Sequence, residues 1–207
     1  TYTSTSSAAS DVYKRQEEVY AQIELDLQNA IASLPNSQSQ VGRVNKYTAY
    51  ALLGKVLLYQ DKFTEAASAL DNVIGVYSLV SDYGSQFLRF GENGPESVFE
   101  IQYSNQSNWY DWGCAHCSEG NYAIIMNGPR GWSGPEYAQG WSFNVPTEEF
   151  YNSFEEGDSR RDATVLDIEA FAAATGASYT EGYDHTGYFN NKYIPRAGES
   201  GGQTELN

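Results

Sequence analysis

A group of carboxylates in the second half of the chain is the first candidate for chemistry. Glycoside hydrolysis uses two carboxylic acids, one on either side of the scissile bond. The group comprises Glu148, Glu149, Glu155, Glu156 and Asp158. A sequence does not give the separation on which that mechanism depends, and helix-end charge with ion pairing to Arg160 and Arg161 accounts for the same residues. We therefore favour a structural role for these carboxylates over a catalytic one.

Two cysteines, Cys114 and Cys117, flank His116 with a spacing known from redox and metal sites. A structural zinc site needs four ligands, and His185 is the only other histidine. A haem-attachment signature needs histidine directly after the second cysteine, where Ser118 stands. A thioredoxin-type role needs a βαβ context, which the pattern lacks. We predict no metal and no cofactor, and a local disulfide is favoured over free thiols.

All four tryptophans fall in or beside a long Gly-rich stretch without regular periodicity, residues 104–143. The C–H patch of a pyranose ring packs on an aromatic face, and polar neighbours read its hydroxyls. The predicted ligand-binding residues are Trp109, Tyr110, Trp112, Trp132 and Trp141, with Asn108, Asp111, Asn127 and Arg130 as polar neighbours. Alternatively, these aromatics fill a small core of the loop itself, because large aromatic side chains are usually mostly buried. For any single tryptophan we favour the core, whereas for the group we expect at least one ligand contact.

Charge and hydropathy exclude several classes of partner. The chain of 207 residues has a net charge of -15, which argues against nucleic acid and against docking on anionic lipid. No apolar run is long enough to predict a transmembrane helix. Signatures of a serine nucleophile elbow, a phosphate loop or a calcium loop are absent from the sequence.

Residues 45–74 have the pattern of two antiparallel helices, around which the rest of the chain is organised. The first stripe is Tyr47, Tyr50, Leu53, Leu57 and Leu58, and the second, after Asp61-Lys62, is Phe63, Ala66, Ala67, Leu70, Val73 and Ile74. The spacing Tyr50-x2-Leu53-Gly54-x2-Leu57, then Ala66-x3-Leu70, is close to the tetratricopeptide pattern. One such hairpin cannot bury both of its faces, so we expect helical neighbours.

The remaining elements are predicted from shorter patterns. Residues 17–34 have the periodicity of an amphipathic helix that ends at Pro35. Short helices are expected at 82–90 and 146–154, the second capped by Thr147, and short strands at 96–103 and 192–195. Residues 168–174 form an Ala-rich piece.

The domain organisation follows from these elements. Residues 1–16 are rich in Ser and Thr and are interpreted as a linker or a non-native leader. Residues 17–207 are interpreted as one domain, with a helical part (17–76), an irregular ligand-facing part (77–195) and a polar tail (196–207). The predicted fold class is mainly α: a tetratricopeptide-like helical hairpin with a long irregular insertion that carries short strands, an incomplete α-α superhelix.

Five short motifs stand in a characteristic order. They are the helix from Tyr20 to Pro35, the run Ala51-Leu52-Leu53-Gly54-Lys55-Val56-Leu57-Leu58-Tyr59, the run Asn93-x2-Glu96-Ser97-Val98-Phe99-Glu100-Ile101, Pro146-Thr147 with Phe154-x3-Asp158-x-Arg160-Arg161, and Lys192-Tyr193. Together they resemble SusD/RagB-type outer-membrane lipoproteins over residues 17–195. Such proteins begin with a lipidated cysteine and an earlier helical repeat, and they continue with further repeat helices after the Lys-Tyr motif. This chain has neither, so we expect an internal fragment.

The resemblance implies a function in nutrient uptake and polysaccharide utilisation. A RagB-like or SusD-like protein is expected at the cell surface, on the outer membrane, where it captures a glycan or oligosaccharide without catalysis. It would pass this ligand to a SusC-like TonB-dependent transporter. The first alternative is a tetratricopeptide-type module that docks a protein partner, and a less favoured one is part of a glycan-degrading enzyme.

Overall fold

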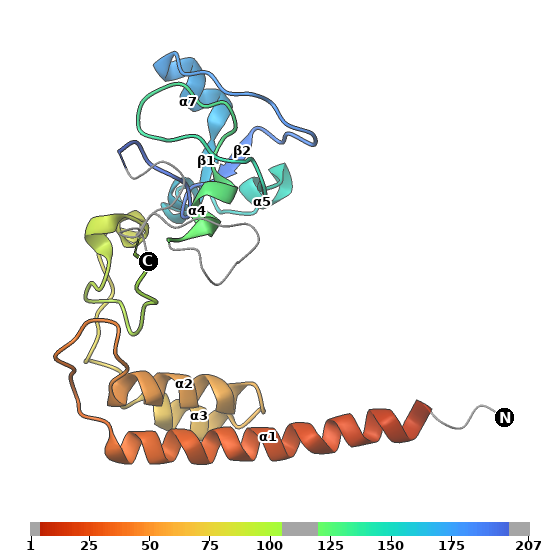
Figure 1. The fold of residues 1–207 in the computed structure, drawn as a ribbon, viewed down its shortest axis with the longest axis vertical. Helices are drawn as coiled ribbons and strands as arrows, with labels where there is room; N and C mark the ends of the chain where they lie inside the picture. The colour runs from red at the N-terminus through yellow and green to blue at the C-terminus, as the bar shows by residue number, and fades with distance from the viewer. Residues whose placement is uncertain (1–4, 105–119, 199–207) are drawn as a thin grey trace. The chain divides into compact units, whose positions relative to one another are not determined.

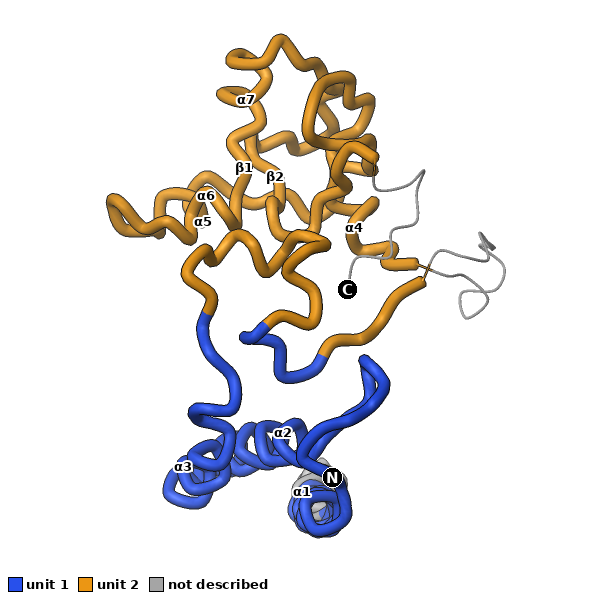
Figure 2. Tube along the Cα trace, turned by 90° about the vertical axis from the view of Figure 1, so that its left-hand side faces the viewer, with its two compact units in different colours: residues 1–79, 95–99 blue, residues 80–94, 100–207 orange. Residues whose placement is uncertain are grey.

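A computed structural model describes residues 5–104 and 120–198 of the chain, with side chains from residue 15 onward (Figure 1). The chain divides into two compact units (Figure 2). Unit 1 comprises residues 1–79 and 95–99, and unit 2 comprises residues 80–94 and 100–207. Among the residues described, no helix combines the length and the apolar character that a membrane crossing requires.

Unit 1 consists of three helices: α1 (Thr5–Ser33), α2 (Lys46–Leu58) and α3 (Phe63–Leu70). Figure 1 shows α2 and α3 side by side, with α1 running along them. Leu53 and Leu57 of α2 and two alanines of α3 are buried together, and Leu27 and Ile31 of α1 pack against them. The predicted hairpin, and with it the mainly α, tetratricopeptide-like fold class, is confirmed.

Local interactions fix the start of α2 and the turn from α2 to α3. The Asn45 side chain accepts hydrogen bonds from the backbone N–H groups of Tyr47 and Thr48, while Thr48 Oγ1 accepts from the Asn45 N–H, which makes a capping box. Asp61 adopts a left-handed backbone, φ 58°, at the turn to α3. At the helix crossing, a β-carbon on Gly54 would come within 2.6 Å of the Leu70 side chain. The small residue there is therefore what lets the two helices approach.

Two sequence predictions for unit 1 are corrected. The first helix begins at Thr5 rather than at residue 17, so most of the predicted linker is helical. The second stripe is only partly buried: Phe63 is 62% exposed, and Leu70 and Ile74 are exposed as well. Ala66 and Ala69 of α3 are buried against α2, and the Leu70 side chain rests on Gly54 while 39% exposed, whereas Phe63 and Ile74 stay exposed.

Unit 2 is built from short elements joined by long connections. Its helices and strands are η1 (Tyr83–Phe87), η2 (Arg89–Gly91), α4 (Tyr122–Asn127), α5 (Glu148–Asn152), α6 (Arg160–Thr164), β1 (Val165–Asp167), α7 (Ile168–Thr175) and β2 (Tyr188–Asn190). The two strands pair antiparallel, with Leu166 opposite Phe189. The short helix predicted at 146–154 is confirmed as α5, and Thr147 caps it by accepting from the Phe150 N–H.

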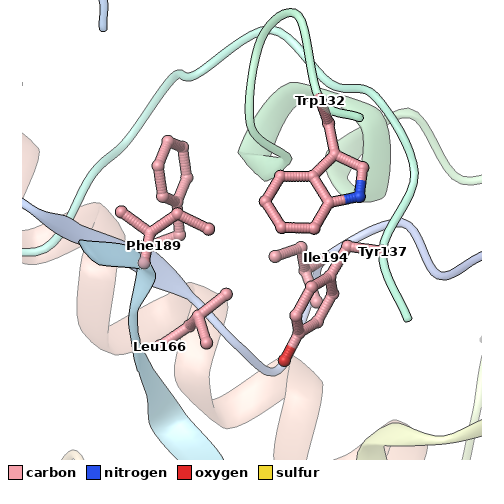
Figure 3. Close-up of a cluster of buried hydrophobic side chains, with 6 residues drawn as sticks. Trp132, Tyr137, Leu166, Phe189 and Ile194 are labelled. Carbon is pink, nitrogen blue, oxygen red and sulfur yellow. The ribbon is translucent and has the colours of Figure 1, made fainter. Parts of the chain in front are cut away.

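The core of unit 2 gathers around this small sheet (Figure 3). Its buried residues come from segments far apart in the sequence and are Trp132, Tyr137, Leu166, Ile168, Phe189 and Ile194. Phe189 and Ile194 are almost completely buried. One cluster thus holds the loop after α4, the sheet and the segment after β2 together.

Three predictions for the chain after residue 80 are corrected. Residues 96–103 form no strand, and Phe99 and Ile101 are exposed. The strand expected at 192–195 lies earlier, as β2; the Asn190 side chain accepts from the N–H groups of Lys192 and Tyr193 and turns the chain there. The helix expected at 82–90 is two short 3₁₀ turns.

Candidate functional site

The predicted ligand-binding residues divide into two groups. Asn108, Trp109, Tyr110, Asp111 and Trp112 lie outside the described residues, as do both cysteines and His116. The other four, Asn127, Arg130, Trp132 and Trp141, fall on α4 and the connection that follows it. The described part of the candidate site is therefore α4 and the connection that follows it.

Trp132 belongs to the core. It is 9% exposed, its ring meets the Tyr137 ring edge to face at 5.8 Å between centroids, and it lies 6.0 Å from the Phe171 ring. Figure 3 shows the indole among the side chains of the cluster. Its Nε1 has no hydrogen-bond partner among the described residues. This position agrees with the alternative of a core tryptophan, and we leave Trp132 out of the binding surface.

Trp141 lies on a segment, residues 140–143, which is bonded to the C-terminal end of α4. Four consecutive backbone N–H groups donate to carbonyls of α4 and the residues just after it, at 2.8 or 2.9 Å. The pairs are Gly140 to Pro129, Trp141 to Ile125, Ser142 to Gly128 and Phe143 to Met126. The carbonyls at the end of a helix lack partners within the helix, so this segment satisfies them. Four consecutive N–H groups are thereby fixed, and the backbone that carries Trp141 is rigid.

Two glycines permit this close approach. A β-carbon on Gly140 would lie 2.4 Å from the Gly128 Cα, and one on Gly128 would lie 2.5 Å from the Pro195 side chain. Ordinary carbon contacts are about 3.5–4 Å apart. A side chain at Gly140 would therefore push segment 140–143 away from α4, and one at Gly128 would collide with Pro195.

Arg130 is held next to Trp141. Its backbone N–H donates to Ser142 Oγ and its Nη2 donates to the Trp141 carbonyl, both at 2.8 Å. The arginine is exposed, Trp141 is half-buried, and the Trp141 ring meets the Phe143 ring edge to face at 6.0 Å. We call Arg130, Trp141 and Phe143 the Trp141 platform. Phe143, which is 51% exposed, is a member that sequence reasoning missed.

Unusual backbone angles occur at Ser142 in this segment and at two residues near it. Glu136, Ser142 and Asn144 have positive φ angles of 66°, 58° and 53°. Non-glycine residues seldom adopt this conformation, and it collects at ligand and switch sites when the surroundings impose it. Here the hydrogen bonds to α4 impose it at Ser142, which aims the flanking aromatic residues.

Asn127 is bonded within α4. It is buried, and its Nδ2 donates to the Ala123 carbonyl one turn earlier in α4 at 2.7 Å. The same helix is capped at its other end by Asn121, whose side chain accepts from the Ala123 N–H. Of the four described candidates, Arg130 and Trp141 are thus brought together, while Trp132 and Asn127 have structural roles.

The carboxylates have structural surroundings. Glu148 and Glu149 are exposed in the first turn of α5, where negative charge is favourable. Asp158 accepts from the Arg160 side chain, with 2.6 Å between Oδ2 and Nη2, and this pairing lowers the pKa of Asp158 to about 2. Arg161 pairs with Asp162 instead and lies over the Tyr151 ring. Within the described ranges, no group of His, Cys, Asp or Glu side chains is arranged to hold a metal ion.

These features define a class of protein: a tetratricopeptide-like hairpin joined to an irregular unit that presents rigid aromatic side chains. No protein-family model matches the sequence. A structure described as a laminarin binding SusD-like protein has 40% identity and a TM-score of 0.81 over 92% of this chain and 45% of its own. The surface glycan-binding protein A of Bacteroides thetaiotaomicron, solved with laminarihexaose, has 27% identity and a TM-score of 0.80 over 92% of this chain and 46% of its own.

A curated relative agrees with the structural neighbours. SusD-like protein P2 of Formosa agariphila is 32% identical over 161 residues, which are 75% of this chain and 30% of the relative. The chain belongs to the SusD-like family. It spans less than half the length of each of these three proteins.

Proposed function

We propose that this chain is the part of a surface glycan-binding protein that contacts its ligand, and that the ligand is a laminarin-type oligosaccharide. The Trp141 platform is the observation that carries the proposal. Relatives with the same fold support it, because one is described as laminarin binding and another was solved with laminarihexaose. Binding takes place without chemistry.

The platform suits a sugar for physical reasons. The Trp141 indole is half-buried on a backbone segment bonded to α4, and an aromatic ring held in this way stacks on the C–H patch of a pyranose at little entropic cost. Arg130 adds N–H donors for hydroxyl oxygens within the same short stretch of chain. The remaining predicted residues, from Asn108 to Trp112, lie outside the described residues and stay predicted ligand-binding residues.

The wider role follows the family. The protein acts at the cell surface on the outer membrane and hands its glycan to a SusC-like TonB-dependent transporter. One observation favours a second candidate, a protein-docking module: the apolar side chains of Phe63, Leu70 and Ile74 are exposed on and just after α3. A glycan-degrading enzyme is the least supported, because the described carboxylates serve helix ends and an ion pair.

Calorimetric titration of the chain with laminarihexaose tests the proposal. Trp141→Ala removes the ring that stacks on the sugar, and we expect affinity to fall about tenfold or more, which is about 1.4 kcal/mol. Tyr183→Ala is the matched control, since Tyr183 is 96% exposed and lies outside the platform. Unchanged affinity in Trp141→Ala, or no binding by the unmodified chain, rejects the proposal.

A further inference from the structure

Unit 1 contains a groove of about 750 Å³ between α1 and the turn that joins α2 to α3. Its side on α1 is formed by Tyr20, Glu24 and Gln28, among others, and its side on the turn by Tyr59, Gln60 and Lys62. Ligand sites in proteins are typically about 300–1,000 Å³. We call this feature the Tyr20–Tyr59 groove, and all of it lies in unit 1.

A hydrogen-bond network ties the two sides of the groove together. Gln60 Nε2 and Lys62 Nζ both donate to Glu24 Oε1, at 2.8 and 2.5 Å. Gln60 Nε2 also bonds the Val56 carbonyl of α2. The network fixes α1 against the turn, and it leaves Glu24 Oε2 without a hydrogen bond among the described residues.

Aromatic rings stand on both sides. Tyr20 is half-buried on α1, whereas Tyr59, the C-cap of α2, is 70% exposed. An exposed tyrosine adds nothing to the core, and its ring with its hydroxyl suits an amphipathic ligand. Ala21 and Leu25 add apolar surface and the remaining lining residues are polar, so the groove is mixed in character.

The residues that line the groove indicate the chemical class of its ligand. Gln28 supplies a carboxamide, and Gln60 keeps its Oε1 as an acceptor because its Nε2 already bonds Glu24 and Val56; these groups match the hydroxyls of a sugar. Glu17 and Glu24 outweigh the single cation of Lys62, which already pairs with Glu24, so an anionic ligand is repelled. We propose that the Tyr20–Tyr59 groove is a second saccharide site, which takes a neutral oligosaccharide. This inference rests on the proposed glycan-binding function and adds a site remote in sequence from the Trp141 platform.

Residue-resolved ¹H–¹⁵N NMR of the chain, titrated with laminarihexaose, tests the inference. We expect saturable shifts at the amides of Tyr59, Gln60 and Lys62. These shifts persist in Trp141→Ala and vanish in Tyr59→Ala, while the Trp141-dependent shifts of unit 2 persist in Tyr59→Ala. A sulfated oligosaccharide of the same length produces none of the groove shifts.

Contrary outcomes separate the two proposals. Shifts confined to unit 2 overturn the groove site and leave the proposed function standing, whereas no shifts in either unit overturn both. Groove shifts that disappear in Trp141→Ala, or survive in Tyr59→Ala, also overturn an independent site. Because Tyr59 is exposed, its replacement leaves the fold intact; Gln28→Ala, on the facing helix, gives a second variant with the same expected loss.

Discussion

The contact between Gly128 and Gly140 gives the sharpest prediction, through the variant Gly140→Ala. The added β-carbon would lie 2.4 Å from the Gly128 Cα and 2.5 Å from both the Gly128 carbonyl carbon and the Ile125 carbonyl oxygen. All three neighbours are backbone atoms, which cannot rotate away as a side chain end can. The two backbones must therefore separate by about 1 Å to reach ordinary contact.

The cost can be estimated from that separation. Forcing an extra carbon into a packed site costs about 1–3 kcal/mol. The hydrogen bonds from segment 140–143 to α4 are now 2.8 or 2.9 Å, and each one broken costs about a further 1 kcal/mol. We expect the free energy of unfolding to fall by about 3 kcal/mol. Laminarihexaose affinity falls as well, because Trp141 lies on the displaced segment.

Urea denaturation and calorimetric titration measure the two effects. Gly182→Ala is the matched control: its β-carbon would meet only the Ser142 side chain, at 4.0 Å, so we expect a change within about 0.5 kcal/mol. If Gly140→Ala is as stable as Gly182→Ala and binds as the unmodified chain does, the close crossing does not position the platform and the reasoning is refuted.

Further predictions concern the hairpin, a helix cap and an ion pair. Leu53→Ala opens the core of unit 1 and should cost about 2–5 kcal/mol in urea denaturation, whereas exposed Phe63→Gln should stay within about 0.5 kcal/mol; equal costs would contradict the observed orientation of α3. Thr147→Ala removes the cap of α5 and should lower the free energy of unfolding by about 1 kcal/mol, while Thr147→Ser should restore most of it. The Asp158 pKa of about 2, below the usual 3.8, means that its pairing with Arg160 contributes stability above pH 3.8 and loses it as the pH falls toward 2. In Arg160→Gln, an NMR titration should return that pKa to near 3.8, and an unmoved pKa would contradict the pairing.

Sequence patterns predicted the helices whose signals lie in neighbouring residues. The period of Leu53 and Leu57 gave α2, and the pairing of Thr147 with the glutamates after it gave α5, because both signals are local. Strand β1 was missed and β2 was placed too late in the sequence, since each has three residues and exists only through its pairing with a segment far along the chain. The alternation at 96–103 gave a false strand prediction, because alternation is a local signal and strand formation also depends on residues far away in the sequence.

The site shows the same limit more sharply. Nothing local distinguishes Trp132 from Trp141, which stand on one connection in similar Gly-rich surroundings. Trp132 is drawn inward by Tyr137 and Phe171, whereas Trp141 is kept outward by hydrogen bonds to the end of α4. The close approach of Gly128 and Gly140 positions Trp141. The sequence shows both glycines, but it does not show that their backbones are in contact.

Intermolecular nuclear Overhauser effects in the chain saturated with laminarihexaose test the platform most directly. We predict contacts between the C–H protons of the sugar ring and the indole protons of Trp141, with none to Trp132. Contacts to Trp132, or bound sugar without any contact to Trp141, would contradict the platform.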